Sequence, residues 1–253
     1  MWGSGPDDVW AVGGVWEESR AGSGTIAHFD GSEWSVAMDD ADQPLVAIWG
    51  SSAEDIYAVG GDEPLHFLHF DGSSWEPVAK PPDIEHCLSG SDVWGSGAED
   101  VFVTTFDSVV YFDGSQWSYL ATLLGSTEPP FTVWGTSGTN VYVGHGNGLI
   151  DRWDGSGWTD SLKLVDDWRV GFGGIWGTGE SDIFAVGGYR GITDTVPHTG
   201  YADGACIYHF DGARWIEQEG VRGLSDGLDD VWGASATDVW AVGEEGTVLR
   251  YRK

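Results

Sequence analysis

The amino-acid sequence predicts an all-β fold made from six copies of one small antiparallel sheet, and three observations support this prediction. A Trp-Gly pair recurs with 40 to 56 residues between successive copies, at Trp2, Trp49, Trp94, Trp134, Trp176 and Trp232. Each pair is followed by short runs of β-branched and aromatic residues that end in Gly, Asp or Ser, which is the signal of strands and tight turns. No segment keeps the apolar spacing of an amphipathic helix over three turns.

The second copy shows the elements of one repeat in order. Its four strands are expected at Leu45–Gly50, at Ile56–Val59, at His66–Phe70 and from Trp75 onward. The turn between the first two strands keeps its length in all copies and ends at an Asp or Asn, whose short side chain can accept backbone hydrogen bonds. Four antiparallel strands in a repeat of this length are typical of the blades of a β-propeller. We therefore predict a six-bladed β-propeller of four-stranded antiparallel blades.

The sixth blade is expected to lack its outer strand in this chain. The predicted single domain covers residues 1–253, with blades at about 1–40, 41–80, 81–122, 123–165, 166–220 and 221–253. The last copy has three strands and then ends at Lys253 without the Asp-Gly turn that precedes a fourth. Either this blade has three strands, or a segment upstream of Met1 supplied the fourth. We favour the second alternative, because it would give a normal closure of the ring.

Composition limits the classes of partner. The 41 acidic and 11 basic residues give a formal net charge of −30. Such a field repels nucleic acid and anionic membranes, and it suits a basic partner, cations or a salty environment. No apolar run is long enough to span a bilayer, and no signal peptide is present. We predict no nucleic-acid partner and no membrane insertion, and we expect an extracellular, cell-surface or periplasmic location.

Two recurring elements resemble known repeats. The second strand ends in Gly-Gly in three copies, and an aromatic-Asp-Gly-x-x-Trp element recurs at Phe29, Phe70, Phe112, Trp153 and Phe210. Together they resemble the kelch repeat, and the Trp-Gly and Asp-Gly elements are similar to tectonin-type lectin repeats and to propeller repeats of bacterial surface proteins. Blade three departs from this pattern, with Thr105-Phe106 in place of Gly-Gly. The resemblance covers the whole chain and implies the fold, but propellers serve so many functions that it implies no single activity.

The loops that do not repeat predict where a ligand binds. The loops after the second and fourth strands share one face, and they vary from residues 144–148 in blade four to residues 188–205 in blade five. Insertions on a repeat scaffold usually mark its binding face. Aromatic side chains there can stack on a sugar or anchor a protein. The candidate ligand-binding residues are Trp16, Trp168, Arg169, Tyr189, Arg190, His198, Tyr201 and Asp203.

No catalytic residue and no cofactor are predicted. Asp39, Asp40 and Asp42 form the densest carboxylate cluster on the variable face and could bind Ca²⁺. They lack the Asp-x-Asp-x-Asp-Gly pattern of an EF-hand, so we interpret them first as a solvated acidic loop. Histidines at one repeat position, His28, His69 and His209, are interpreted as structural hydrogen-bond donors. The loop histidines His86, His145 and His198 show no metal-ligand spacing.

Three functions from different classes remain. The preferred one is a non-enzymatic binding module that recognises a glycan or protein on the variable face. The second is a scaffold or assembly subunit whose sixth blade accepts a strand from a partner, because an exposed sheet edge is a template for strand addition. The third is a hydrolase or lyase acting on polysaccharide, which would need acidic residues or a His/Tyr base from different blades to converge. The sequence contains no sialidase-type Asp-box, metal triad or nucleophile elbow.

Overall fold

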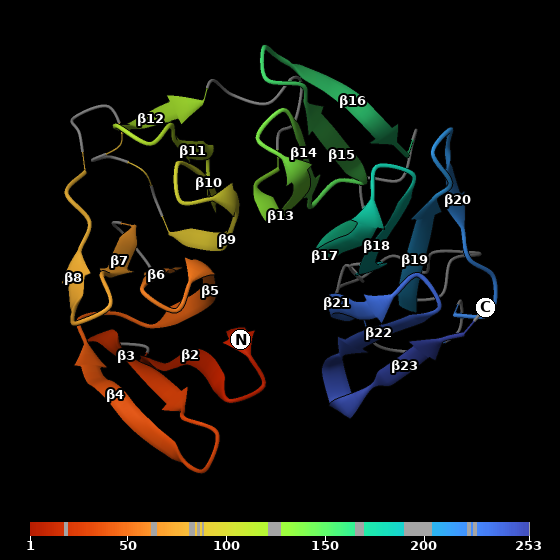
Figure 1. Ribbon diagram of the computed structural model, residues 1–253. Helices are drawn as coiled ribbons and strands as arrows, with labels where there is room; N and C mark the ends of the chain where they lie inside the picture. Colours follow the sequence, from red (N-terminus) through yellow and green to blue (C-terminus); the bar gives the residue numbers. More distant parts are fainter. Residues whose placement is uncertain are drawn as a thin grey trace. The chain divides into compact units, whose positions relative to one another are not determined.

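The structure is a computed structural model of the chain. It describes residues 1–17, 20–61, 65–80, 84, 87, 89–120, 128–164, 170–189, 204–221, 224 and 227–252. The chain divides into two compact units, Met1–Thr122 (unit 1) and Leu123–Lys253 (unit 2) (Figure 1). The prediction of one domain stays a prediction.

Unit 1 contains three four-stranded sheets, and in each the strands follow one another in sequence and pair antiparallel. The first sheet is formed by β1 (Trp2–Gly5), β2 (Asp8–Glu17), β3 (Arg20–Phe29) and β4 (Trp34–Ala41). The second is formed by β5 (Leu45–Ser52), β6 (Asp55–Gly60), β7 (His66–Phe70) and β8 (Trp75–Pro77). The third is formed by β9 (Gly90–Gly97), β10 (Asp100–Thr105), β11 (Val109–Phe112) and β12 (Trp117–Leu120).

Unit 2 contains two four-stranded sheets and one sheet of three strands. The fourth sheet of the chain is formed by β13 (Pro130–Ser137), β14 (Asn140–His145), β15 (Leu149–Trp153) and β16 (Trp158–Lys163). The fifth is formed by β17 (Val170–Gly179), β18 (Asp182–Tyr189), β19 (Gly204–Phe210) and β20 (Trp215–Glu217). The sixth is formed by β21 (Leu228–Ser235), β22 (Asp238–Gly243) and β23 (Val248–Tyr251), with the short 3₁₀ turn η1 (Glu244–Gly246) before β23. The predicted architecture of six antiparallel blades, the sixth with three strands, is confirmed.

Two of the predicted loops are in fact strands. Trp16 was predicted in a loop, and this is wrong: β2 continues past Gly13-Gly14 to Glu17, and Glu17 pairs with Arg20 of β3. The prediction that Asp39 and Asp40 lie in a loop is also wrong, because β4 extends to Ala41 and pairs with Gly24. Glycine weakens a strand but does not end it when β-forming residues such as Val15 continue the ladder on its far side.

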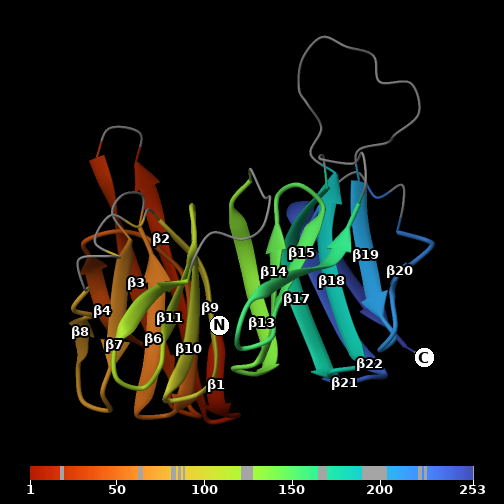
Figure 2. The ribbon, with the colours of Figure 1, turned by 90° about the horizontal axis from the view of Figure 1, so that it is seen from above.

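Alternation along the strands explains how each sheet packs against two neighbours. Ile56 and Tyr57 of β6 follow one another, so their side chains point to opposite faces. Ile56 belongs to a buried cluster with Trp10 and Ile26 of the first sheet, and Tyr57 to a cluster with Val101 of the third. Within each unit, strands of neighbouring sheets run alongside one another (Figure 2).

The Trp-Gly pair is explained by packing between neighbouring sheets of one unit. A β-carbon placed on Gly50 would lie 2.8 Å from Cη2 of Trp2, and one on Gly95 would lie 2.6 Å from Cη2 of Trp49. Unit 2 repeats this arrangement. Glycine is required at these positions because the Trp ring of the preceding sheet lies directly against its backbone.

The described part of the chain contains no helix with the length and hydropathy needed to cross a membrane.

Candidate functional site

Most of the candidate ligand-binding residues lie outside the described residues. These are Trp168, Arg169, Arg190, His198, Tyr201 and Asp203. Trp16 lies in β2, and Tyr189 is the last residue of β18 instead of a loop residue; only their backbones are described. The ligand-binding role of all eight residues stays a prediction.

The acidic cluster does not form a described metal site. The exposed Asp39 accepts a hydrogen bond of 3.3 Å from Oγ1 of Thr25, and Asp42, beyond the end of β4, is also exposed. The side chain of Asp40 lies outside the described residues. Across the side chains that the structure describes, no three of His, Cys, Asp and Glu are grouped as metal ligands.

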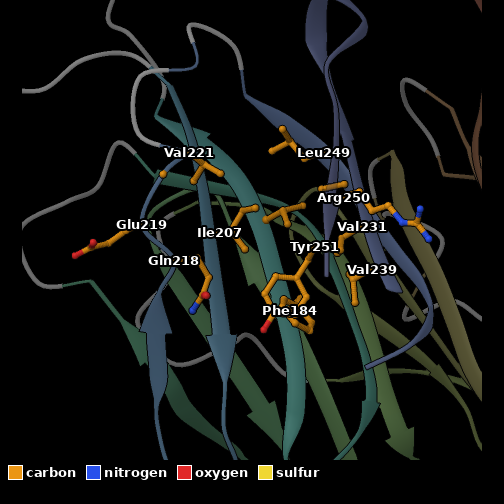
Figure 3. A pocket seen from close by; sticks show the side chains of 13 residues that line it. Phe184, Ile207, Gln218, Glu219, Val221, Val231, Val239, Leu249, Arg250 and Tyr251 are labelled. Carbon is orange, nitrogen blue, oxygen red and sulfur yellow. The ribbon is translucent and has the colours of Figure 1, made fainter. Parts of the chain in front are cut away.

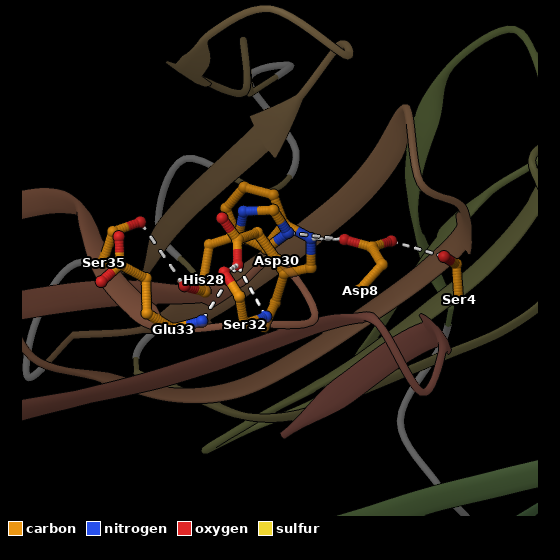
Figure 4. A network of polar contacts seen from close by, with 8 residues as sticks. Ser4, Asp8, His28, Asp30, Ser32, Glu33 and Ser35 are labelled. Carbon is orange, nitrogen blue, oxygen red and sulfur yellow. Dashed lines mark hydrogen bonds and ion pairs between the residues drawn. The ribbon is translucent and has the colours of Figure 1, made fainter.

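A Ser–Asp–His network lies at the start of the second strand in the first and second sheets, and Thr178 replaces the Ser in the fifth sheet. In the first sheet, one carboxylate oxygen of Asp8 accepts a hydrogen bond from Ser4, and the other lies 2.6 Å from Nε2 of His28 (Figure 4). Burial raises the pKa of Asp8, but the hydrogen bonds from Ser4 and His28 lower it more, and the pKa ends below its usual value. The imidazole of His28 also stacks on Trp10, with ring centroids 4.1 Å apart.

This network has the residue types of a hydrolase triad but not its connectivity. A catalytic triad places His between Ser and Asp, so that the imidazole can take the serine proton. Here the Asp lies between the Ser and the His, and its carboxylate contacts both side chains. Comparable networks are centred on Asp8, Asp55, Asp182 and Asn140, and in the fourth sheet the third member is Arg152, whose Nε lies 2.6 Å from Asn140. A group that recurs with substitutions in sheet after sheet acts as a structural clamp, as the sequence predicted for these histidines.

The strongest candidate for a functional site is an apolar groove in unit 2. Its volume is about 310 Å³, and it lies between the fifth sheet and the three-stranded sixth sheet (Figure 3). The apolar lining side chains come from β18, β19, β21, β22, β23 and the segment after β20, and they are Phe184, Val186, Ile207, Val221, Val231, Val239, Ala241, Leu249 and Tyr251. Gln218 and Glu219 lie at the rim, with Glu219 directed outward.

The sheet edge beside the groove belongs to β23. The order of the sixth sheet is β21-β22-β23, so only one side of β23 is paired in the described chain. Leu249, Arg250 and Tyr251 of β23 all line the groove. The side chain of Arg250 places its Nε 2.7 Å from Oδ1 of Asp238 and its guanidinium over Trp240. The groove therefore lies beside a row of backbone groups that have no strand partner among the described residues.

Two aromatic rings form one wall of the groove. The rings of Phe184 and Tyr251 have centroids 5.4 Å apart and are tilted by 55°. In unit 1 the corresponding rings are Trp10 and Phe70, with centroids 5.0 Å apart and a tilt of 47°. There a third ring, that of Trp75 on the fourth strand, covers the pair at 5.6 Å from Trp10 and 5.4 Å from Phe70.

One buried pair of a histidine and an aspartate was not predicted from the sequence. Nε2 of His145 lies 3.3 Å from Oδ2 of Asp151, and both side chains are fully buried. His145 was interpreted as a loop residue but ends β14. The signal was present in the repeat: His145 occupies the position of Gly60 and Gly187, and Asp151 the position of Leu68.

The residues that line the groove were not predicted from the sequence as site residues either. Those on the strands occupy ordinary core positions of the repeat, so none of them stands out in the sequence. The one signal that pointed to this place is the expected absence of a fourth strand after Tyr251.

Comparisons with known proteins bear on the fold. A scan against protein-family models finds no match, and neither does a search of curated proteins. Among solved structures, the chain is similar to the GH74 xyloglucanase from Xanthomonas campestris, with a TM-score of 0.69, 12% identity and coverage of 98% of this chain but only 43% of the xyloglucanase. It is also similar to Sqt1 from Chaetomium thermophilum, with a TM-score of 0.64, 13% identity and coverage of 98% and 79%. A chain of the nidogen/laminin complex gives a TM-score of 0.60 at 12% identity, with coverage of 96% and 89%. At such identities the likeness shows the fold alone, and that fold is a six-bladed β-propeller whose last blade has three strands in this chain.

Proposed function

We propose that this chain is a non-enzymatic binding module that takes an extended segment of another polypeptide as the fourth strand of its sixth blade. The observation that carries the proposal is the coincidence of the unpaired edge of β23 with the apolar groove beside it. Strand addition uses both features, because backbone hydrogen bonds supply affinity and alternate side chains enter pockets.

The repeat itself shows which backbone groups of β23 are available. In the second sheet the N–H of Val78, three residues after Trp75, donates to the carbonyl of Phe67 at 2.9 Å. In the fifth sheet the N–H of Gln218 donates to the carbonyl of Ile207 at 2.8 Å. Val248 occupies the same position in β23, and hydrogen-bonded pairs alternate along an antiparallel ladder. The N–H and C=O groups of Val248 and Arg250 therefore face the incoming strand.

Charge favours one kind of polypeptide. With a formal net charge of −30, the chain attracts basic segments at long range and repels acidic ones. We therefore propose a partner segment that is extended at its centre and flanked by Lys or Arg.

The finer sequence-based proposals concern other parts of the molecule. A glycan or protein ligand on the variable loops, the kelch-like or tectonin-like character of the repeats and an extracellular location remain compatible with strand addition. Ca²⁺ binding near Asp42 also remains a proposal. The connectivity of the Ser–Asp–His networks gives a hydrolase no support from these residues.

The test uses a synthetic peptide with the sequence of residues 113–120, which contains the fourth strand of blade three, followed by three lysines and fluorescein. We expect saturable binding to chain 1–253 by fluorescence anisotropy, weakened by added salt. We also expect slower hydrogen exchange at the backbone amides of Val248 and Arg250. Absence of saturable binding, or protection confined to other strands, would overturn the proposal.

Variants that remove backbone hydrogen bonds at the edge of β23 distinguish strand addition from other modes of binding. Val248→Pro removes an N–H at the first residue of β23, where Pro is tolerated. The preceding Thr247 already has φ −60° and ψ 126°, which suit a following Pro. Val248→Pro should weaken binding about tenfold, and Val248→Ala should not. Peptides N-methylated at the amides that face β23 make the same test without changing the protein. Unchanged binding of both Val248→Pro and the methylated peptides would refute strand addition, and a concentration-dependent dimer that Val248→Pro abolishes would identify a second copy as the occupant instead.

A further inference from the structure

We infer that the incoming strand begins with a tryptophan, whose ring inserts against Phe184 and Tyr251. This inference rests on the proposed function and adds the chemical identity of the anchoring residue. The groove would then bind strands that begin with an aromatic residue in preference to other extended polypeptide segments.

The inference is based on the fourth strands of the five complete sheets. In each of them the fourth strand begins with a Trp that pairs with the last aromatic residue of the third strand. The pairs are Phe29 with Trp34, Phe70 with Trp75, Phe112 with Trp117, Trp153 with Trp158, and Phe210 with Trp215. The ring centroids of these pairs lie 5.0 to 5.5 Å apart. Tyr251 occupies the position of the first member in β23.

Three of these Trp residues, Trp75, Trp117 and Trp215, make a second ring contact in the preceding sheet of the same unit. Trp75 meets Trp10 edge-on with centroids 5.6 Å apart, and Trp117 meets Tyr57 in the same way at 5.7 Å. The residue at this position in the fifth sheet is Phe184, which is 2% exposed and lines the groove. Phe184 and Tyr251 thus reproduce the two-ring platform that Trp covers in the second sheet, with nearly the same separation and tilt.

The register of the complete sheets orients the rest of the strand. With Trp opposite Tyr251, the next residue lies opposite Arg250 and the third opposite Leu249. The first and third side chains then point into the apolar groove, and the second points to the other face beside the Arg250–Asp238 pair. This groove therefore favours Trp, then a polar residue, then an apolar residue. The peptide of residues 113–120 meets this pattern with Trp117, Ser118 and Tyr119.

The test compares matched forms of the lysine-tagged peptide on chain 1–253. The Trp117 position is replaced by Phe, Leu or Ala, and in a further peptide Trp and the following Ser exchange places. We expect the Ala form to bind at least about tenfold more weakly than the Trp form, since a buried aromatic anchor dominates interfaces of this size. The Phe form should be intermediate, and the exchanged peptide should bind no better than the Ala form.

A variant of the protein tests whether the Trp ring of the peptide packs on Tyr251. Tyr251→Ala should strongly weaken binding of the Trp peptide but hardly change binding of the Ala peptide. The effects of the Tyr251 change in the protein and of the Trp→Ala change in the peptide are then not additive. Val248→Ala, on the opposite face of the same strand, serves as the control, and the thermal unfolding midpoint of each variant shows that it folds. If Tyr251→Ala does not fold, Tyr251→Leu keeps the apolar volume and removes only the ring.

The outcomes separate the inference from the function on which it rests. Equal affinity of the Trp and Ala peptides, with Val248→Pro still reducing both, overturns the Trp anchor and leaves strand addition standing. Additive effects of Tyr251→Ala and the Trp→Ala change would place the tryptophan away from this platform. Binding of neither peptide overturns the proposed function.

Discussion

The ring of Trp176 lies against the backbone of Gly233, so closely that a β-carbon on that glycine would stand 2.5 Å from Cη2 of the ring. The two residues belong to successive Trp-Gly pairs, one in the fifth sheet and one in the sixth. The dipeptide therefore does two separate tasks. Its Trp packs toward the following sheet, and its Gly makes room for the Trp of the preceding one.

The first prediction concerns that contact in unit 1. Gly95→Ala should destabilise the fold by about 1–3 kcal/mol, because the added methyl would meet Cη2 of Trp49 at 2.6 Å and the carbonyl oxygen of Asp100 at 2.7 Å. Gly97→Ala, two residues further along β9, would place its methyl more than 4 Å from the other described residues and should be nearly neutral. Urea unfolding of both variants measures the difference, and equal stability would contradict the packing argument.

The second prediction compares two tryptophans at the same repeat position. Trp75 is 9% exposed and packs on Trp10 and Phe70, so Trp75→Ala should cost about 3–5 kcal/mol. Trp34 is 51% exposed, and Trp34→Ala should cost clearly less. Thermal and urea unfolding give both values, and a cost for Trp34 as large as that for Trp75 would show that the repeat position matters more than burial.

The third prediction concerns acid stability of the Asp-Gly turns. Oδ1 of Asp71 accepts hydrogen bonds from the hydroxyl of Ser73 at 2.6 Å and from the N–H groups of Ser73 and Ser74, and these lower its pKa to about 2. A carboxyl with a lowered folded-state pKa stabilises the fold above its unfolded pKa of 3.8, and this contribution is lost as the pH falls toward 2. Asp71→Asn should therefore be less stable than the parent chain at pH 7, and the difference should shrink between about pH 4 and pH 2.

A second variant isolates the main cause of that shift. Ser73→Ala removes the hydroxyl donor and should raise the pKa of Asp71 toward its ordinary value, as followed by NMR titration of the side-chain carboxyl. An unchanged pKa in Ser73→Ala would assign the shift to the backbone donors alone.

The fourth prediction concerns the buried pair of His145 and Asp151. Removing one partner, by Asp151→Leu or His145→Gly, should destabilise the fold by about 3–5 kcal/mol, because the other buried polar group loses its neighbour. The double variant restores the residue types found at these positions in blade two and should recover most of that loss. A double-mutant cycle from urea unfolding measures the coupling, and additive losses would show that the pair does not act as a unit.

Much of the fold could be predicted because each copy of the repeat tests the others. A strand–turn pattern that recurs around every Trp-Gly pair is a local signal, set by β-branched residues and by turn residues such as Asp71 and Gly72. The limits of the strands were harder to predict. The extension of β2 to Glu17 depends on pairing with Arg20, and the sequence around Gly13-Gly14 does not carry that information.

The sequence by itself determined the number of blades, the order of their strands and the place at Tyr251 where the fourth-strand pattern stops. These properties follow from periodicity and turn chemistry, which act between residues close in the chain. Only the tertiary structure decided that Phe184 of one blade and Tyr251 of the next form a two-ring platform in an apolar groove, and that Asp8 holds Ser4 and His28 in a clamp without triad connectivity. Contacts between sheets depend on which faces meet, and no local pattern along a single strand records its neighbour.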